Sequence, residues 1–142
     1  MKKRILTLLI FVNLISCTKS ENIPNSEFFG NWRLIKMTGS SINSESKGKD
    51  MEWKESYLFN ENGTFQKFRE TDKCSFVASG TFKVKSTANE TTIELLFDYE
   101  SNILGSCYSS TLKEILVQNS ENSLYNTWSN CDGPRLEYRK IN

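Results

Sequence analysis

Residues 53–69 read WKESYLFNENGTFQKFR, and this stretch decides the fold that the sequence predicts. Trp53, Tyr57 and Phe59 alternate with other residues, which is the period of a strand with one buried face. The tetrapeptide Asn-Glu-Asn-Gly at 60–63 is typical of a tight turn between two antiparallel strands. The stretch therefore predicts a β-hairpin.

The same alternation continues along the rest of the chain, which has no long helical stripe. Strands with one buried and one solvated face are typical of an antiparallel sheet, and closing the sheet removes its exposed edges. The connections are mostly short. We therefore predict an all-β protein, an eight-stranded antiparallel up-and-down β-barrel. Its strands are expected at approximately Phe28–Thr38, Trp53–Asn60, Thr64–Thr71, Ser75–Lys85, Thr91–Tyr99, Ser110–Gln118, Ser123–Ser129 and Arg135–Ile141.

Composition excludes several classes of function. The 142 residues hold 18 Lys and Arg against 17 Asp and Glu, a net charge of +1, which does not favour a nucleic-acid partner. There is no histidine, so imidazole bases and His-ligated metals are excluded. No motif pairs the carboxylates, although a glycosidase-like pair distant in sequence stays open. We expect no enzyme, no cofactor and no metal site.

The N-terminus is typical of an export signal. Basic residues precede the apolar run Ile5–Ile15, which is shorter than the roughly 20 residues of a membrane-spanning helix. The stretch Leu14-Ile15-Ser16-Cys17 resembles the lipobox of bacterial lipoproteins, in which the cysteine thiol receives a diacylglyceryl group. The alternative is an ordinary secretory signal that contains a cysteine.

Three segments follow from this interpretation. Residues 1–16 form a lipoprotein signal peptide, 17–26 a lipidated spacer, and 27–142 one domain. Lipidation at Cys17 would place the protein in the bacterial cell envelope, held to a membrane by its acyl chains. The composition leaves open whether it faces the periplasm or the cell surface.

The order of several short motifs resembles the lipocalin-like domain of small bacterial lipoproteins. Gly30-Asn31-Trp32 is similar to the Gly-x-Trp signature of lipocalins. Tyr57–Phe65, Gly80–Val84 and Leu136–Lys140 are similar to later pieces of the same domain. The resemblance implies a lipocalin-like barrel that binds a small hydrophobic or amphipathic molecule.

The resemblance also implies roles for particular residues. Gly30 and Trp32 would be structural, and Arg139 would pack across Trp32 at the closed end. Strict alternation from Leu136, however, points Arg139 outward. The segment 39–52 corresponds to the lid of lipocalins, or is a solvated loop with no role.

Cys74, Cys107 and Cys131 fall at the open end of the traced barrel, and an exported protein permits a disulfide. Any of the three pairings is compatible with the spacing. The resemblance favours Cys74 with Cys131, because lipocalins often tether their C-terminal portion to an earlier strand. A three-thiolate metal site is the alternative.

Charged residues fall at inward positions. Pairing the first two strands sets Trp32 opposite Phe59, Leu34 opposite Tyr57 and Lys36 opposite Glu55, to within one or two residues, with the last pair near the mouth. A three-residue turn with Gly63 in the left-handed conformation would pair Phe59 with Phe65 and turn the next cations inward. A two- or four-residue turn would direct Phe68 inward instead. A further alternative is that strand twist or a bulge carries the charges to the surface. The predicted ligand-binding residues are Lys36, Glu55, Lys67 and Arg69 in a hydrated region that could seat an anionic headgroup, and Tyr57, Phe97 and Trp128 in an apolar pocket.

The expected partner is thus a small apolar or amphipathic molecule. Two alternatives stay open, since side chains can fill an eight-stranded barrel. One is a protein-binding module that uses its rim loops, as in lipoprotein inhibitors of lysozyme or proteases. The other is a structural lipoprotein of the envelope.

Overall fold

The computed structural model describes residues 26–107 and 112–141. This part of the chain folds into β-strands and short 3₁₀ turns. The strands are β1 (Gly30–Thr38), β2 (Glu45–Lys47), β3 (Lys54–Phe59), β4 (Thr64–Glu70), β5 (Ser75–Ser86), β6 (Thr91–Phe97), β7 (Lys113–Ser120), β8 (Ser123–Asn126) and β9 (Arg135–Ile141). The 3₁₀ helices are η1 (Ser26–Phe28), η2 (Gly48–Asp50) and η3 (Trp128–Cys131).

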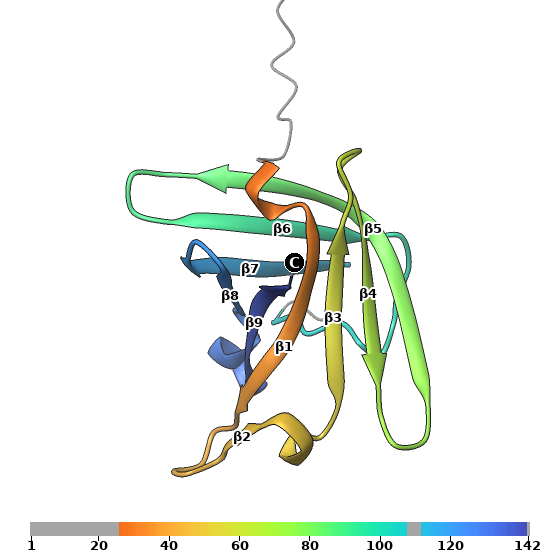
Figure 1. Cartoon of the computed structure of the whole chain (residues 1–142), viewed down its shortest axis with the longest axis vertical. Helices are drawn as coiled ribbons and strands as arrows, with labels where there is room; N and C mark the ends of the chain where they lie inside the picture. Colours follow the sequence, from red (N-terminus) through yellow and green to blue (C-terminus); the bar gives the residue numbers. More distant parts are fainter. Residues whose placement is uncertain (1–25, 108–111, 142) are drawn as a thin grey trace, which may run out of the picture.

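The strands close into a barrel. They pair antiparallel in the order β2-β1-β3-β4-β5-β6-β7-β8-β9, and β1 also pairs with β9 (Figure 1). Strand β1 and strands β3 to β9 therefore form a closed eight-stranded antiparallel barrel, as predicted. Strand β2 is a short addition to the edge of β1 that the alternation did not reveal.

The hairpin between β3 and β4 has the predicted register. The Asn60 N–H donates to the Thr64 carbonyl at 2.9 Å, and the Gly63 N–H donates to the Asn60 carbonyl at 3.1 Å. Gly63 has φ +80°, a conformation that favours glycine. Phe59 therefore pairs with Phe65, and the interpretation built on Gly63 is confirmed.

Strand β1 pairs with β3 at the limit of the predicted register, since Trp32 lies opposite Tyr57, two residues from Phe59. It departs from the prediction further along. The pairing with β9 contains a bulge between Leu34 and Lys36. Because the bulge inserts one residue, Met37 rather than Lys36 turns into the core.

Aromatic rings fill the barrel from its closed end. Phe59 packs on Phe82 with ring centroids 4.8 Å apart, and Phe65 meets Phe97 edge-on at 4.9 Å. At Gly80 an added Cβ would lie 2.0 Å from the Leu96 carbonyl oxygen, so only glycine allows β5 to approach β6 this closely.

The closed end is covered by η1 and the start of β1. The Trp32 indole Nε1 donates to the Phe28 carbonyl at 2.8 Å, and both side chains are fully buried. The Lys140 ammonium lies 5.9 Å from the centroid of the Trp32 ring and donates to the Glu27 carbonyl. Gly30, with φ +105°, lets the chain pass from η1 into β1.

The role expected for Arg139 was wrong. Arg139 is exposed on the outer wall, and Lys140 lies over Trp32 instead. Leu136 and Tyr138 are buried, so the alternation of β9 directs residue 140 and not residue 139 toward the interior.

Candidate functional site

Four charged side chains meet inside the barrel, near its open end. Glu55 comes from β3, Lys67 and Arg69 from β4, and Glu114 from β7, and all four are buried. The Gly63 turn fixes the first three on the inner face, because it sets which residues of β4 share a face with Glu55.

Glu55 is held by three donors. The Arg69 Nε donates to Glu55 Oε2 at 2.5 Å, and the Tyr138 hydroxyl donates to Oε1 at 2.6 Å. The Lys67 ammonium lies 3.4 Å from the same Oε1. Arg69 is also covered on one side by the Trp53 ring, 4.3 Å from its guanidinium carbon.

Glu114 is also held by three donors. The Lys67 ammonium donates to Oε1 at 2.7 Å, the Tyr57 hydroxyl donates to Oε2 at 2.6 Å, and the Gly105 N–H donates to Oε1. Lys67 thus bridges Glu55 and Glu114. The cluster carries two positive and two negative charges, so no net charge is buried.

Burial itself and the buried charges raise the pKa values of the two tyrosines. Burial, and then the nearby charge of Glu114, raise the pKa of Tyr57 well above its usual range. Burial and the charge of Glu55 do the same to the pKa of Tyr138. Both hydroxyls therefore stay protonated and act as hydrogen-bond donors.

The open end is covered by the loop after β6. The Ile103 side chain is buried, and its carbonyl accepts a hydrogen bond from Arg69 Nη2 at 3.2 Å. Further along, Gly105 contacts Glu114 as described. The loop is therefore held from inside by two charged residues, Arg69, which was expected to face a ligand, and Glu114.

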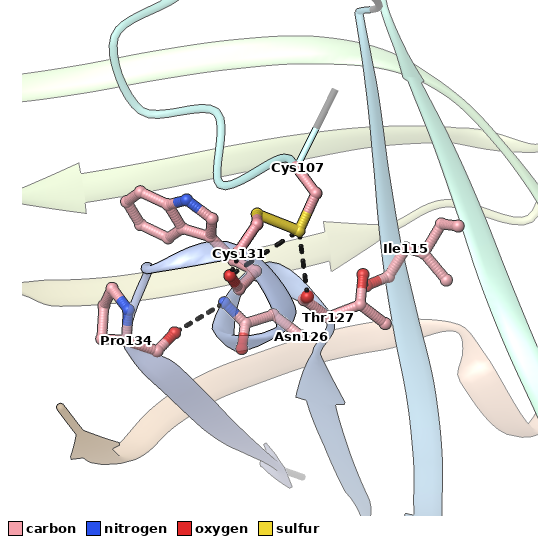
Figure 2. Close-up of a disulfide and its surroundings, with 7 residues drawn as sticks. Cys107, Ile115, Asn126, Thr127, Cys131 and Pro134 are labelled. Carbon is pink, nitrogen blue, oxygen red and sulfur yellow. Dashed lines mark hydrogen bonds between the residues drawn. A yellow bond between two sulfur atoms is a disulfide. The ribbon is translucent and has the colours of Figure 1, made fainter. Parts of the chain in front are cut away.

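A disulfide fixes the far end of this loop. Cys107 is bonded to Cys131 in η3, and Figure 2 shows the bond beside the turn that leads from β8 to β9. Asn126 secures that turn, since its Nδ2 donates to the Pro134 carbonyl at 3.2 Å and its Oδ1 accepts from the Leu136 N–H at 2.8 Å.

The expected disulfide partner was wrong. The structure pairs Cys107 with Cys131 and leaves Cys74 as a free, exposed thiol. Cys74 lies in the turn between β4 and β5, where its backbone bonds to Thr71, away from η3. The lipocalin pattern of tethering an earlier strand therefore did not apply here.

Lys36 does not reach the interior either. The bulge in β1 turns it outward, where its ammonium lies 2.7 Å from Glu137 and 3.5 Å from Glu45. The hydrogen bond to Glu137 raises the pKa of Lys36 above its ordinary value. The predicted pair of Lys36 with Glu55 is thus replaced by an outer ion pair.

The apolar pocket expected from Tyr57, Phe97 and Trp128 does not form from these residues. Tyr57 and Phe97 belong to the packed aromatic stack, where Phe65 lies between them. Trp128 lies in η3 at the open end, because β8 ends at Asn126. There the Trp128 ring packs so closely on Gly105 that an added Cβ would lie 2.8 Å away.

The structure adds two residues that the sequence did not single out. Glu114 and Tyr138 complete the cluster, although they lie 59 and 83 residues after Glu55. Glu114 alternates with the buried Leu116 along β7, and that alternation was the signal available.

A groove opens on the outer wall, beside the seam between β1 and β3. These strands pair only from Gly30 to Arg33, and beyond that point β1 pairs with β2 instead. The two strands diverge there toward η2 (Figure 1). The groove has a volume of about 580 Å³ and is lined by Arg33, Leu34, Ile35, Gly48, Met51, Lys54, Glu55, Ser56, Phe68 and Glu70.

The groove combines apolar walls with charges at its margin. Leu34 is a core residue, and Phe68 is 37% exposed on the outer face of β4. Lys54 and Glu70 form an ion pair at 3.6 Å, so these two charges already satisfy one another. A mainly apolar groove of this size with a few polar groups matches the usual anatomy of a small-molecule site.

The part of the chain that the structure describes holds neither a metal-binding cluster nor a membrane-spanning helix. Among residues 26–107 and 112–141, no cluster of three or more His, Cys, Asp or Glu side chains could hold a metal ion. No helix in this part of the chain has the length and apolar character needed to cross a membrane. Cys17 and the signal segment lie outside the described residues.

Comparison with known proteins gives no match. No family model, no curated protein and no solved structure matches the chain.

Proposed function

We propose that this protein is a lipid-anchored, lipocalin-like lipoprotein of the bacterial cell envelope that binds a small amphipathic molecule. The groove beside the seam of β1 and β3 carries the proposal, because it joins an apolar wall to charged margins in a volume that suits a small molecule. The closed barrel and the Gly30-Asn31-Trp32 motif support the lipocalin-like assignment.

The groove supports this function better than the barrel interior does. Inside, Glu55 and Glu114 are already bonded to cations and tyrosines, and a ligand would have to displace these partners. Leaving a buried charge without its partner costs several kcal/mol, about 3–5. The groove reaches Glu55 at its base, but the charges at its margin, Lys54 and Glu70, are already paired with each other, so a ligand there need not displace the partners of the buried cluster.

The binding experiment uses residues 18–142, which include every strand and core residue of the barrel. After export to the periplasm, the protein is analysed by native mass spectrometry and titrated with an apolar fluorescent probe. Wild type is expected to bind one probe. Ser56→Phe should abolish binding, because residue 56 lines the groove from the outer face of β3. Absence of binding by wild type would contradict the proposal.

Thr81→Phe is the matched control. Thr81 also lies on the outer wall, but on β5, and lines a separate, smaller hollow. The control should retain wild-type affinity. Equal loss in both variants would mean that a bulky ring on the wall, rather than the groove, is responsible, and would count against the site.

The anchor is tested separately, since it rests on Leu14-Ile15-Ser16-Cys17. The full chain, expressed with radiolabelled palmitate, should carry the label, and Cys17→Ser should lose it. The disulfide between Cys107 and Cys131 supports export, because such bonds persist in oxidising compartments. An unlabelled wild type would refute lipidation.

One observation favours protein binding as a second candidate function. Ile42 is 94% exposed between β1 and β2, and the Ser44 hydroxyl and N–H both donate to the Ser41 carbonyl, which shapes this loop. A fixed loop with an apolar tip suits insertion into a partner's cleft. Assays of lysozyme and protease inhibition test this, and Ile42→Ser should remove any inhibition that wild type shows.

A further inference from the structure

Two arginines lie side by side on the outer wall without any acidic partner. Arg33 of β1 and Arg139 of β9 are directly opposite one another in the register. Side chains opposite each other in an antiparallel pair have Cβ atoms about 5 Å apart. Both residues are exposed, and within residues 26–107 and 112–141 neither side chain has an ion pair or hydrogen bond.

This arrangement is unfavourable by itself. Like charges directly opposite on one face of a sheet destabilise it. Several other cations of the outer wall do have acidic partners, as the ion pairs of Lys36 with Glu137 and of Lys113 with Glu94 show. Arg33 and Arg139 therefore differ from these cations in having room for an external anion.

Arg33 also lines the groove, which joins the cationic pair to the apolar wall. The register places Arg33 opposite Ser56, Ser56 opposite Phe68, and Phe68 opposite Val77 on the outer face. Val77 is 56% exposed. A row across the barrel wall thus runs from two guanidinium groups over a small serine to exposed apolar side chains.

We infer that this row binds an anionic amphiphile with a phosphate headgroup and a single aliphatic chain. The inference rests on the proposed function and names the class of its ligand. Arg33 and Arg139 bind the phosphate, since each guanidinium group can donate two parallel hydrogen bonds to phosphate oxygens. The aliphatic chain lies in the groove against Ile35, Met51 and Phe68.

The test compares three probes by calorimetric titration of residues 18–142, below micelle concentrations. Dodecyl phosphate carries both the chain and the headgroup, dodecyl maltoside carries the chain alone, and inorganic phosphate carries the anion alone. Wild type is expected to bind dodecyl phosphate at least about tenfold more tightly than either of the others. Arg33→Gln combined with Arg139→Gln should lower dodecyl phosphate affinity to that of dodecyl maltoside.

The control removes two other exposed cations, Lys73 and Lys83, by Lys→Gln substitution. It lowers the net charge by the same amount, so it measures any general electrostatic effect, and its preference for dodecyl phosphate should persist. The unfolding midpoint of each variant, measured without ligand, shows that the variants fold. The arginine variant should be no less stable than wild type, because it removes a repulsion.

The outcomes separate this inference from the proposed function. Equal affinity of wild type for dodecyl phosphate and dodecyl maltoside would overturn the role of the arginines and leave the groove as a site for neutral amphiphiles. Inorganic phosphate binding as tightly as dodecyl phosphate would overturn the role of the apolar wall. Failure of all three probes would refute the proposed function itself.

Discussion

Lys67 holds the interior of the barrel together. Its ammonium is fully buried and lies within 3.4 Å of one carboxylate and 2.7 Å of the other. An ion cluster of this kind adds little over a well-packed apolar interior, but losing one member leaves an uncompensated charge. The cluster therefore matters to stability mainly because removing any one of its members is costly.

Removing Lys67 should be costly. Lys67→Met leaves Glu55 and Glu114 facing each other with only Arg69 as a cation, and we expect a loss of about 3–5 kcal/mol in unfolding free energy at neutral pH. Urea denaturation measures this. Lys83→Met, on the exposed face of β5, should change stability by less than about 0.5 kcal/mol. A loss in Lys67→Met no larger than in the control would contradict this account.

The tyrosines predict how stability depends on alkaline pH. The pKa values of Tyr57 and Tyr138 are raised in the folded state, so above pH about 10 the unfolded chain loses protons that the folded chain keeps. The contribution of the two tyrosines to the free energy of unfolding is therefore complete below that pH. Above it, this free energy declines by about 1.4 kcal/mol per pH unit for each tyrosine.

Urea midpoints between pH 8 and 12 check this, in a Cys74→Ser background that prevents thiol exchange at high pH. Tyr138→Phe should make the decline of unfolding free energy with pH shallower by about 1.4 kcal/mol per pH unit, whatever the stability of the variant at neutral pH. A slope identical to that of the parent would show that the Tyr138 hydroxyl titrates alike in both states.

The sequence predicted the direction of a side chain correctly where that direction is set by residues close by in the chain. The inward positions of Lys67 and Arg69 follow from Gly63, a few residues away. The outward position of Lys36 depends on a one-residue bulge, and a period-two pattern carries no sign of where such a bulge falls. The contact of Lys67 with Glu114 depends on closure of the whole barrel, which no local pattern encodes.

At the scale of elements, the loop after β6 and η3 form one cover over the open end. Cys107 and Cys131 join them, with a sequence separation of 24. Trp128 packs on Gly105 and on Gly133, where an added Cβ would lie within 2.4 Å of the indole. The cover is thus held by a covalent bond, by packing, and by the buried charges beneath it.

Replacing both half-cystines with serine should lower the unfolding free energy by roughly 3.5 kcal/mol, the loop-closure value for this separation. Trp128 should also become more exposed, which tryptophan fluorescence would record as a red shift. Cys74→Ser, the third cysteine, should leave both quantities unchanged. Unchanged stability after loss of both Cys107 and Cys131 would show that the other contacts suffice.

Element boundaries were harder to predict than element types. Strand β8 was expected to reach Ser129, but it ends at Asn126, whose side chain bonds to the backbone at Pro134 and Leu136. A side chain that takes over backbone partners ends a strand without any change in hydrophobic pattern. The prediction that Trp128 lines the interior was wrong because it assumed that β8 continues past Asn126.

At the scale of the whole molecule, the barrel is closed at one end by η1 and covered at the other. Phe28 is fully buried and stacks with Trp32 at 6.3 Å, so a residue outside the strands completes the core. We expect Phe28→Ala to cost about 3–5 kcal/mol, measured by urea denaturation.

The neighbouring Phe29 offers a comparison, because it is only partly buried against the same core. Phe29→Ala should cost clearly less than Phe28→Ala. Equal losses would mean that the apolar content of residues 28 and 29 in general stabilises the barrel, and that closure by Phe28 in particular is not the reason.

The pairing of β1 with β9 brings the two ends of the folded chain together, since Asn31 lies opposite Ile141 and Lys140 bonds to Glu27. A short linker could therefore join residue 141 to residue 26, and new termini could be opened beside the exposed Ile42. Such a circular permutant would keep every strand pair of the barrel. The fold would then depend on which strands are neighbours in space, and not on where the polypeptide begins.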